Sequence, residues 1–162
     1  MMRTWSPRQG GSELGPRALG ARSILADPRT TAGSDALNER IKHREPFRPF
    51  APAVLAGTWF DLDVASPFMP LAPPVSADHA DKIAGVVHVE GTARVQTVDP
   101  ATAPLYGALI EHFHQLTGVP VVLNTSFNDC EPIVETPGHV LATFQACDLD
   151  AAGIGEYLVE RC

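Results

Sequence analysis

Basic side chains are concentrated near the start of the chain, among glycines and prolines that form rigid turns. Gly15-Pro16-Arg17-Ala18-Leu19-Gly20 is followed by Ile41-Lys42-His43-Arg44-Glu45-Pro46-Phe47-Arg48-Pro49-Phe50. The first 50 residues hold nine Lys and Arg against five Asp and Glu, whereas the remaining 112 hold three against fourteen. Because the whole chain has a formal net charge of −7, this basic charge is local. A local basic cluster in an acidic protein predicts a site for phosphate or carboxylate ligands.

Each of these cations also has a simpler interpretation. Arg17 lies between two glycines that let the backbone approach a ligand closely, although arginines in turns are more often plain surface residues. Lys42 and Arg44 follow a predicted helix, whose dipole favours cations at that end. Arg48 stands between two prolines and beside two phenylalanines that we expect to be buried, so we expect it to be rigid and to need a partner. From spacing alone, Arg48 is as well explained with an anion-ligand role as without one.

Polar residues of the second half complete the set of candidates. In a strand predicted over 94–98, Arg94 and Gln96 share one face, which either floors a ligand cleft or faces solvent. A buried strand then ends in Asn124-Thr125-Ser126-Phe127-Asn128. Ligands of open α/β sheets lie beyond the carboxyl ends of strands, although such short polar residues also simply make turns. His88 heads a turn before Arg94, and its position alone favours a structural role.

Other chemistries have less support. The chain has no Gly-x-x-x-x-Gly-Lys phosphate loop and no Gly-x-Ser-x-Gly nucleophile elbow. Cys130, Cys147 and Cys162 lack metal-type spacing, so we expect no bound metal and a reducing, cytoplasmic location. No apolar run approaches the ~20 residues that span a bilayer, so we expect no membrane partner. Overall acidity, and the lack of aromatics interleaved with the basic residues, argue against specific nucleic-acid binding.

The predicted elements alternate between strands and helices. We expect a flexible segment over 1–12, a helix over 35–42 capped by Ser34, an edge strand or buried extended segment over 47–55 because of its prolines, and a long loop over 61–82. Strands over 86–89 and 94–98, joined by a turn, should precede a helix from Pro104 to Gly118 whose apolar stripe is Leu105, Leu109, Phe113 and Leu116. A buried strand over 119–123 should follow, then a helix from Thr136-Pro137 that faces inward with Val140, Leu141, Phe144 and Cys147, and a last strand over 152–159. This order predicts one α/β or α+β domain, over 13–162, with a twisted, partly parallel sheet.

Several motifs, taken in sequence order, resemble a known family. They are Glu13 to Arg29, Arg44-Glu45-Pro46-Phe47-Arg48-Pro49-Phe50-Ala51-Pro52, Gly91-Thr92-Ala93-Arg94-Val95-Gln96, Asn124 to Asn128, Glu131-Pro132-Ile133-Val134 and Asp148-Leu149-Asp150. Together they resemble the C-terminal domain of the O-carbamoyltransferases, a family that includes the enzymes acting on nodulation factors, cephem antibiotics and tobramycin. The resemblance runs from about residue 10 to residue 160.

This resemblance implies a YrdC-like open sheet flanked by helices that makes carbamoyl-adenylate from carbamoyl phosphate and ATP with Mg²⁺. In the family an N-terminal domain or subunit with an iron site holds the acceptor hydroxyl, and we expect such a partner, which this chain lacks. By their place in the motifs, the catalytic residues would be Arg17, Lys42, Arg48 and Arg94. The residues binding substrate or nucleotide would be Arg44, His88, Gln96, Asn124, Thr125, Ser126 and Asn128.

Two departures from the family pattern keep a second interpretation open. The turn Asn128-Asp129-Cys130-Glu131-Pro132 is one residue shorter than the family's and lacks its glycine, and Glu90 replaces a usual aspartate. The alternative to a catalytic domain is a non-catalytic remnant, or a subunit that binds a nucleotide or a partner without chemistry.

Overall fold

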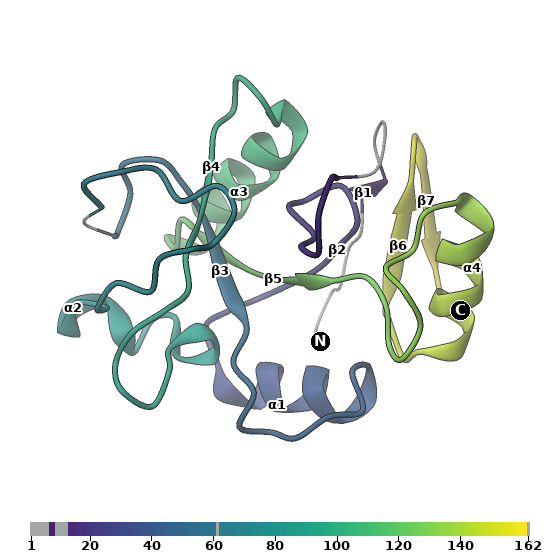
Figure 1. Cartoon of the computed structure of the whole chain (residues 1–162), viewed down its shortest axis with the longest axis horizontal. Helices are drawn as coiled ribbons and strands as arrows, with labels where there is room; N and C mark the ends of the chain where they lie inside the picture. The colour runs from purple at the N-terminus through teal and green to yellow at the C-terminus, as the bar shows by residue number, and fades with distance from the viewer. Residues whose placement is uncertain (1–6, 9–12, 61, 162) are drawn as a thin grey trace.

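Figure 1 shows the computed structural model of the chain, which describes residues 7–8, 13–60 and 62–161. Its elements, in chain order, are β1 (Pro7–Arg8), β2 (Ser23–Ala26), α1 (Thr31–Arg40), β3 (Ala51–Leu55), α2 (Ala77–Ala80), the 3-10 helix η1 (Ala84–Val86), β4 (Gln96–Val98), α3 (Pro104–Thr117), β5 (Val121–Ser126), α4 (Pro137–Ala146), β6 (Ala151–Ile154) and β7 (Tyr157–Glu160). The expected α/β class is confirmed.

The apolar run that forms β5 is an inner strand of the main sheet, whose order is β2-β5-β3-β4. β5 is antiparallel to both of its neighbours, whereas β3 and β4 are parallel. Alternate side chains of these strands enter two separate cores. Val122 packs with Tyr106 and Ile110 of α3, while Val121 and Leu123 join the larger core on the other face. The sheet is therefore covered on both faces, and it is partly parallel as predicted.

Strand directions bring four loop segments to one edge of this sheet. Because β5 runs opposite to β2, β3 and β4, its last residues lie beside the first residues of the other three strands. Ser126 pairs with Ser23 and Asn124 pairs with Ala51. The segments that precede β2, β3 and β4 carry Arg17, Arg44 with Arg48, and Arg94, respectively. The topology thus gathers basic loops around the polar end of β5.

A smaller sheet, ordered β1-β6-β7, lies with α4 at one end of the molecule (Figure 1). The predicted last strand over 152–159 is wrong, because the chain reverses at Gly155, whose φ is 61°, and forms the antiparallel pair β6 and β7. Of the segment predicted to be flexible, residues 7 and 8 form β1, parallel to β6. The rest of that segment, residues 1–6 and 9–12, lies outside the described residues, as does Cys162.

Two elements near the basic cluster differ from expectation. α1 begins at Thr31 rather than Asp35, because the hydroxyl of Thr30, not of Ser34, caps it by accepting a hydrogen bond from Gly33 N–H at 3.3 Å. β3 is an inner strand rather than an edge strand, despite Pro52. The register with β4 starts only at Ala53, so Pro52 itself is paired on one side, as prolines in strands require.

The apolar patterns of the second half were partly misassigned. The predicted strand over 86–89 is wrong: η1 ends at Val86, and His88 N–H donates to the Thr92 carbonyl at 2.7 Å to close a turn. In α3 the side chains facing the sheet are Tyr106 and Ile110, whereas Leu105 and Leu116 of the expected stripe are 52% and 86% exposed. In α4 the expected inward residues are buried except Leu141. None of the described helices is both long and apolar enough to span a membrane.

Candidate functional site

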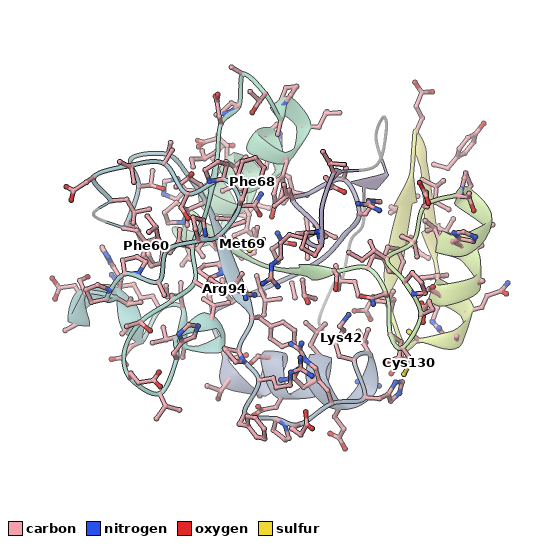
Figure 2. All side chains as sticks on the ribbon, in the orientation of Figure 1. Lys42, Phe60, Phe68, Met69, Arg94 and Cys130 are labelled. Carbon is pink, nitrogen blue, oxygen red and sulfur yellow. The ribbon has the colours of Figure 1, made fainter. Side chains whose placement is uncertain are left out.

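Four arginines line one cavity of about 200 Å³ at the polar end of β5. We call it the arginine cavity, and its walls are Pro16, Arg17 and Ala18, Arg44, Arg48 to Ala51, Met69, Arg94, and Asn124 to Ser126. In the view of Figure 2, Arg94 lies near the middle of the molecule with Met69 above it. The structure thus brings together seven of the eleven predicted site residues: Arg17, Arg44, Arg48, Arg94, Asn124, Thr125 and Ser126.

The positive charges of this cavity are only partly balanced by protein groups, because Glu45 lies near Arg48 but outside the lining. No acidic side chain is among the described residues that line it. Burial, then the like charges of Arg48 and Arg94, lower the pKa of Arg44, and burial together with Arg17 lowers the pKa of Arg94. Within the described part of the chain, Arg44 Nη2 is buried without a hydrogen-bond partner. Like charges held together with unused donors are the environment that a bound anion stabilises.

Arg44 and Arg48 are held by one buried side chain, Asn38 of α1. Asn38 Oδ1 accepts from Arg44 Nε at 2.6 Å, and its amide nitrogen donates to the carbonyls of Pro46 and Arg48. The Arg44 guanidinium also lies over the ring of buried Phe50, 4.5 Å from its centroid. Arg48 differs from expectation: its backbone is fixed, but its side chain is 55% exposed and only 3.9 Å from Glu45.

Asn124 lines the cavity and has one amide atom without a described partner. Its amide nitrogen donates to the Ala18 carbonyl at 3.1 Å and to Gln96 Oε1 at 2.6 Å. Both of these partners accept hydrogen bonds, so the network fixes which end of the amide is the nitrogen. Asn124 Oδ1 is buried and has no partner among the described residues. The wall of the arginine cavity therefore contains four arginines and an asparagine whose amide oxygen is buried without a described partner.

Lys42 does not line the arginine cavity. Its ammonium donates to the carbonyl of Ser126 at 3.0 Å and to Oδ1 of Asn128 at 2.9 Å, and it also contacts the Asn128 carbonyl and the Ser126 hydroxyl. In Figure 2 Lys42 is displaced from Arg94 toward Cys130. Burial, followed by the charge of Arg44, lowers the pKa of Lys42 to about 8, although Asp129 opposes this. Lys42 thus positions the loop after β5 rather than reaching into the cavity.

Three other predicted residues also serve internal hydrogen bonds. Asn128 accepts from the Ser126 hydroxyl and donates to the Glu131 carbonyl at 2.7 Å. Gln96 lies behind the cavity wall and donates to the Leu19 carbonyl at 2.9 Å. His88 lies outside the cavity, with its Nδ1 2.9 Å from the Thr92 hydroxyl and its Nε2 buried without a partner among the described residues.

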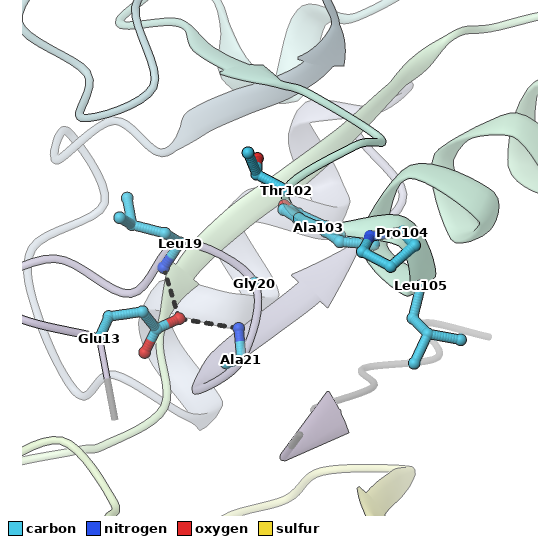
Figure 3. Close-up of a pocket in the computed structure, with 9 residues that line it drawn as sticks. Glu13, Leu19, Gly20, Ala21, Thr102, Ala103, Pro104 and Leu105 are labelled. Atoms are coloured by element: carbon cyan, nitrogen blue, oxygen red, sulfur yellow. Dashed lines mark hydrogen bonds between the residues drawn. The ribbon is translucent and has the colours of Figure 1, made fainter. Parts of the chain in front are cut away.

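Glu13 positions the loop that carries Arg17, a role that the sequence analysis does not predict. Figure 3 shows its carboxylate accepting from the backbone N–H groups of Leu19 at 3.0 Å and Ala21 at 2.8 Å. Arg22 Nε donates to Glu13 Oε2 at 2.7 Å, and we call this set of hydrogen bonds the Glu13 clamp. Burial alone would raise the pKa of Glu13, but these hydrogen bonds lower it. The same segment and the first turn of α3 line a separate, mostly apolar cavity of about 330 Å³ (Figure 3). A glutamate shortly before a Gly-Pro turn is the sequence signal that could have indicated this clamp.

The shortened turn after Asn128 is closed by its own side chains. Besides the bond from Asn128 to the Glu131 carbonyl, Asp129 accepts from His43 at 2.8 Å, and the Thr143 hydroxyl of α4 donates to Glu131 at 2.6 Å. The turn is therefore tied to both α1's end and α4. Within the described residues, no group of three or more His, Cys, Asp or Glu side chains lies close enough together to hold a metal ion.

Comparison with known proteins connects this geometry to a family. The family model described as "Carbamoyltransferase C-terminus" matches residues 4–161. The chain belongs to this family. The resemblance inferred from the ordered motifs is thereby confirmed.

Relatives of this carbamoyltransferase C-terminal domain are much longer proteins. It is 46% identical over 160 residues to nodulation protein NolNO of Sinorhizobium fredii and 44% identical over 160 residues to nodulation protein NolO of Bradyrhizobium diazoefficiens. Each match covers 94% of this chain but only 24% and 29% of the respective relative. Nodulation protein U of Bradyrhizobium diazoefficiens is 43% identical over 122 residues, which are 74% of this chain and 21% of that protein. The chain spans less than a third of the length of these relatives.

Proposed function

We propose that this domain forms carbamoyl-adenylate from carbamoyl phosphate and ATP. The observation that carries the proposal is the gathering of four arginines around one cavity whose wall also contains Asn124, with its amide oxygen unpartnered. Phosphate oxygens accept hydrogen bonds, which arginines donate in fixed geometry. The amino group of carbamoyl phosphate donates hydrogen bonds and needs an acceptor, which Asn124 Oδ1 offers. Membership of the carbamoyltransferase C-terminus family supports the same choice of substrate.

The proposed reaction has two balanced steps. Water first cleaves carbamoyl phosphate to carbamate and inorganic phosphate. A carbamate oxygen then attacks the α-phosphorus of ATP, the bond from that phosphorus to the bridging oxygen breaks, and pyrophosphate leaves with the electron pair. Neither step needs a protein nucleophile, because phosphoryl and adenylyl transfer rely on position and fixed positive charge.

The residues of the cavity have separate tasks in this scheme. Arg44 and Arg94, both about half-buried, hold the phosphate groups, and Arg17 and Arg48 close the cavity from two loops. Asn124 orients the carbamoyl group, and Lys42 keeps Ser126 in place at the cavity wall. Magnesium would arrive on the triphosphate, since Mg²⁺ in such sites binds largely through substrate phosphates and water. The carbamoyl group would then pass to an acceptor held by another domain or subunit, in keeping with the greater length of the relatives.

A pyrophosphate-release assay tests the proposal. We expect the 162-residue chain to release pyrophosphate only when ATP and carbamoyl phosphate are both present. Arg48→Ala should lower that rate by about 10² to 10³, the usual effect of removing one fixed charge near a transferring phosphoryl group. Arg40→Ala is the matched control, because Arg40 pairs with Asp148 on the surface, away from the cavity. Circular dichroism of both variants checks the fold.

The same assay distinguishes the alternative. Titration calorimetry of ATP, with and without carbamoyl phosphate, measures binding independently of turnover. Binding of ATP by the wild type without pyrophosphate release would favour a non-catalytic, nucleotide-binding domain. Normal turnover in Arg48→Ala would contradict the assignment of the arginine cavity.

A further inference from the structure

Met69 contributes the one flexible non-polar side chain to the described wall of the arginine cavity. The other non-polar residues of this wall are alanines, prolines and Phe50, whose ring lies against the Arg44 guanidinium. Met69 comes from the segment expected to be a long loop, yet it is only 7% exposed. Because the cavity is small, at about 200 Å³, the methionine side chain occupies space that a larger ligand would need.

The backbone of Met69 has a conformation that is unfavourable for any residue with a side chain. Its φ is 60°, in the left-handed region. The described non-glycine residues His43 and Trp59 also have positive φ, but neither lines the arginine cavity. Such conformations persist only where the surrounding structure fixes them, and they cluster at ligand sites. The position of Met69 at the cavity wall is therefore enforced by its surroundings.

Hydrogen bonds to the segment that carries Arg94 hold Met69 in place. We call residues 66–75 the strap, because backbone groups and one hydroxyl fasten them along residues 91–97. These bonds run from Ser66 Oγ to the Val95 carbonyl at 2.9 Å, from Val95 N–H to the Leu71 carbonyl at 3.2 Å, from Ala93 N–H to the Pro73 carbonyl at 3.0 Å and from Val75 N–H to the Gly91 carbonyl at 2.8 Å. Met69 and Arg94 thus belong to one braced wall, and moving the strap away would break bonds on both sides of Arg94.

We infer that Met69 limits the size of the acyl group that the arginine cavity accepts, by closing the space beside the bound phosphate. This inference rests on the proposed use of carbamoyl phosphate. The carbamoyl group is among the smallest acyl groups, and a longer one would have to displace Met69 together with the strap. One extra methylene in a hydrophobic pocket changes discrimination by about 10- to 200-fold. Met69 is then a specificity-determining residue, whereas the arginines provide affinity for phosphate.

Binding of simple phosphate esters tests this inference without any turnover. Titration calorimetry of the full chain compares inorganic phosphate, methyl phosphate and butyl phosphate. We expect the wild type to bind butyl phosphate about tenfold more weakly than methyl phosphate, or weaker still. Met69→Gly, which removes the side chain and suits the positive φ, should abolish most of this difference and change the Kd of inorganic phosphate less than about twofold. Met69→Leu should keep the difference, because leucine has a similar volume.

Three results would overturn the inference. The first is equal affinity of the wild type for methyl and butyl phosphate, and the second is an unchanged difference in Met69→Gly. The third is an equal loss of affinity for all three ligands in Met69→Gly, which would mean that Met69 only supports the cavity. Circular dichroism checks the fold, and Met69→Ala gives the same comparison if Met69→Gly does not fold.

Two exposed phenylalanines next to wall residues provide matched controls. Phe68 precedes Met69 and is 66% exposed, and Phe47 precedes Arg48 and is 79% exposed. The expectation that Phe47 is buried is therefore wrong, because Asn38 binds the backbone carbonyls on both sides of it and the ring turns outward. Neither phenylalanine lines the cavity, so Phe68→Ala and Phe47→Ala should keep the difference between methyl and butyl phosphate. Its loss in Phe68→Ala would show that a disturbed strap, and not the methionine side chain, controls the size of the ligand.

Pyrophosphate release with butyryl phosphate in place of carbamoyl phosphate measures the same selection during turnover. Water would cleave butyryl phosphate to butyrate and inorganic phosphate. A butyrate oxygen would then attack the α-phosphorus of ATP, and pyrophosphate would leave with the electron pair. We expect Met69→Gly to raise kcat/KM for butyryl phosphate, relative to that for carbamoyl phosphate, by about tenfold or more.

Failure of the inference and failure of the proposed function give different results. If the wild type releases pyrophosphate from carbamoyl phosphate and ATP, but Met69→Gly keeps the selectivity of the wild type, the function stands and Met69 does not set the size limit. If Met69→Gly admits butyl phosphate but no acyl phosphate supports pyrophosphate release, the size limit stands and the catalytic proposal fails. If the wild type binds none of the phosphates, both are wrong.

Discussion

At the scale of single residues, this domain uses positive charge in two different ways. Four arginines line one cavity with no carboxylate among the described residues of its wall, and Arg44 Nη2 has no described partner, although Arg44 Nε donates to Asn38 and Arg48 lies near Glu45. Lys42, in contrast, gives its donors to oxygens of Ser126 and Asn128. A buried ammonium with protein acceptors fixes a loop, whereas unpaired guanidinium groups select an anion. Lys42 and Arg44 are thus close in sequence, but the first positions a loop and the second lines the arginine cavity.

The pKa of Lys42 gives a prediction about stability. Its value of about 8 in the folded protein lies below the ordinary value of 10.5, so between these pH values the unfolded chain binds more protons. The free energy of unfolding of the wild type, minus that of Lys42→Met, should therefore rise with pH from about 8 to 10.5, with a slope of up to about 1.4 kcal/mol per pH unit. Urea unfolding at several pH values measures it. If the free energies of unfolding of the two proteins changed in parallel with pH, burial would not lower the pKa of Lys42.

At the scale of elements, the site consists of short, braced loops at one edge of the main sheet. The loop of Arg17 is held by Glu13 at one end, and by donors from Asn124 and Gln96 to its carbonyls. Gly20 closes this loop against the buried ring of Tyr106 with φ of 126°. A Cβ there would lie 2.4 Å from Tyr106 Cδ1. The glycine is thus needed for close contact with α3.

Substitution of the two glycines of this loop separates steric contact from backbone strain. Gly20→Ala should lower the free energy of unfolding by about 2 kcal/mol or more, because it adds a clash with Tyr106 to an unfavourable φ. Gly15→Ala is the control: its φ is 109°, but a Cβ there meets nothing within 4 Å. We expect the smaller loss for Gly15→Ala in denaturant unfolding. Equal losses would mean that the contact with Tyr106 adds nothing.

The candidate site was more predictable than the elements around it. Arg17, Arg44, Arg48, Arg94 and Asn124 were grouped by their order in the family motifs, and the structure brings them to the wall of one cavity. The hydrogen bond between Lys42 and Asn128 could not be predicted from the sequence, because the two residues are 86 positions apart. The apolar run at 86–89 resembles a strand, because a short buried segment has too few residues for the spacing of its apolar side chains to distinguish a strand from other structure. The prediction of an edge strand at Pro52 failed for a different reason: an inner strand can contain a proline where the register with one neighbouring strand begins after it.

At the scale of the whole molecule, the chain has a net charge of −7, yet four arginines line one small cavity. Burial, and then the like charges of neighbouring arginines, lower the pKa values of Arg44 and Arg94. The fold therefore holds these charges together at a cost in stability, which a bound anion should offset. The acidic remainder of the surface gives no comparable attraction, so anion binding should depend on this one cavity.

Thermal unfolding of Arg94→Met tests this balance between stability and binding. Methionine keeps much of the side chain's length but removes the charge, so without ligand we expect a Tm equal to or above that of the wild type. Phosphate should raise the Tm of the wild type, by an amount equivalent to about 2.7 kcal/mol at a hundred times Kd, and should raise that of Arg94→Met far less. Arg40→Met, which removes a surface charge paired with Asp148, should keep the full response. A lower Tm for unliganded Arg94→Met together with a normal response to phosphate would mean that Arg94 stabilises the fold and does not bind the anion.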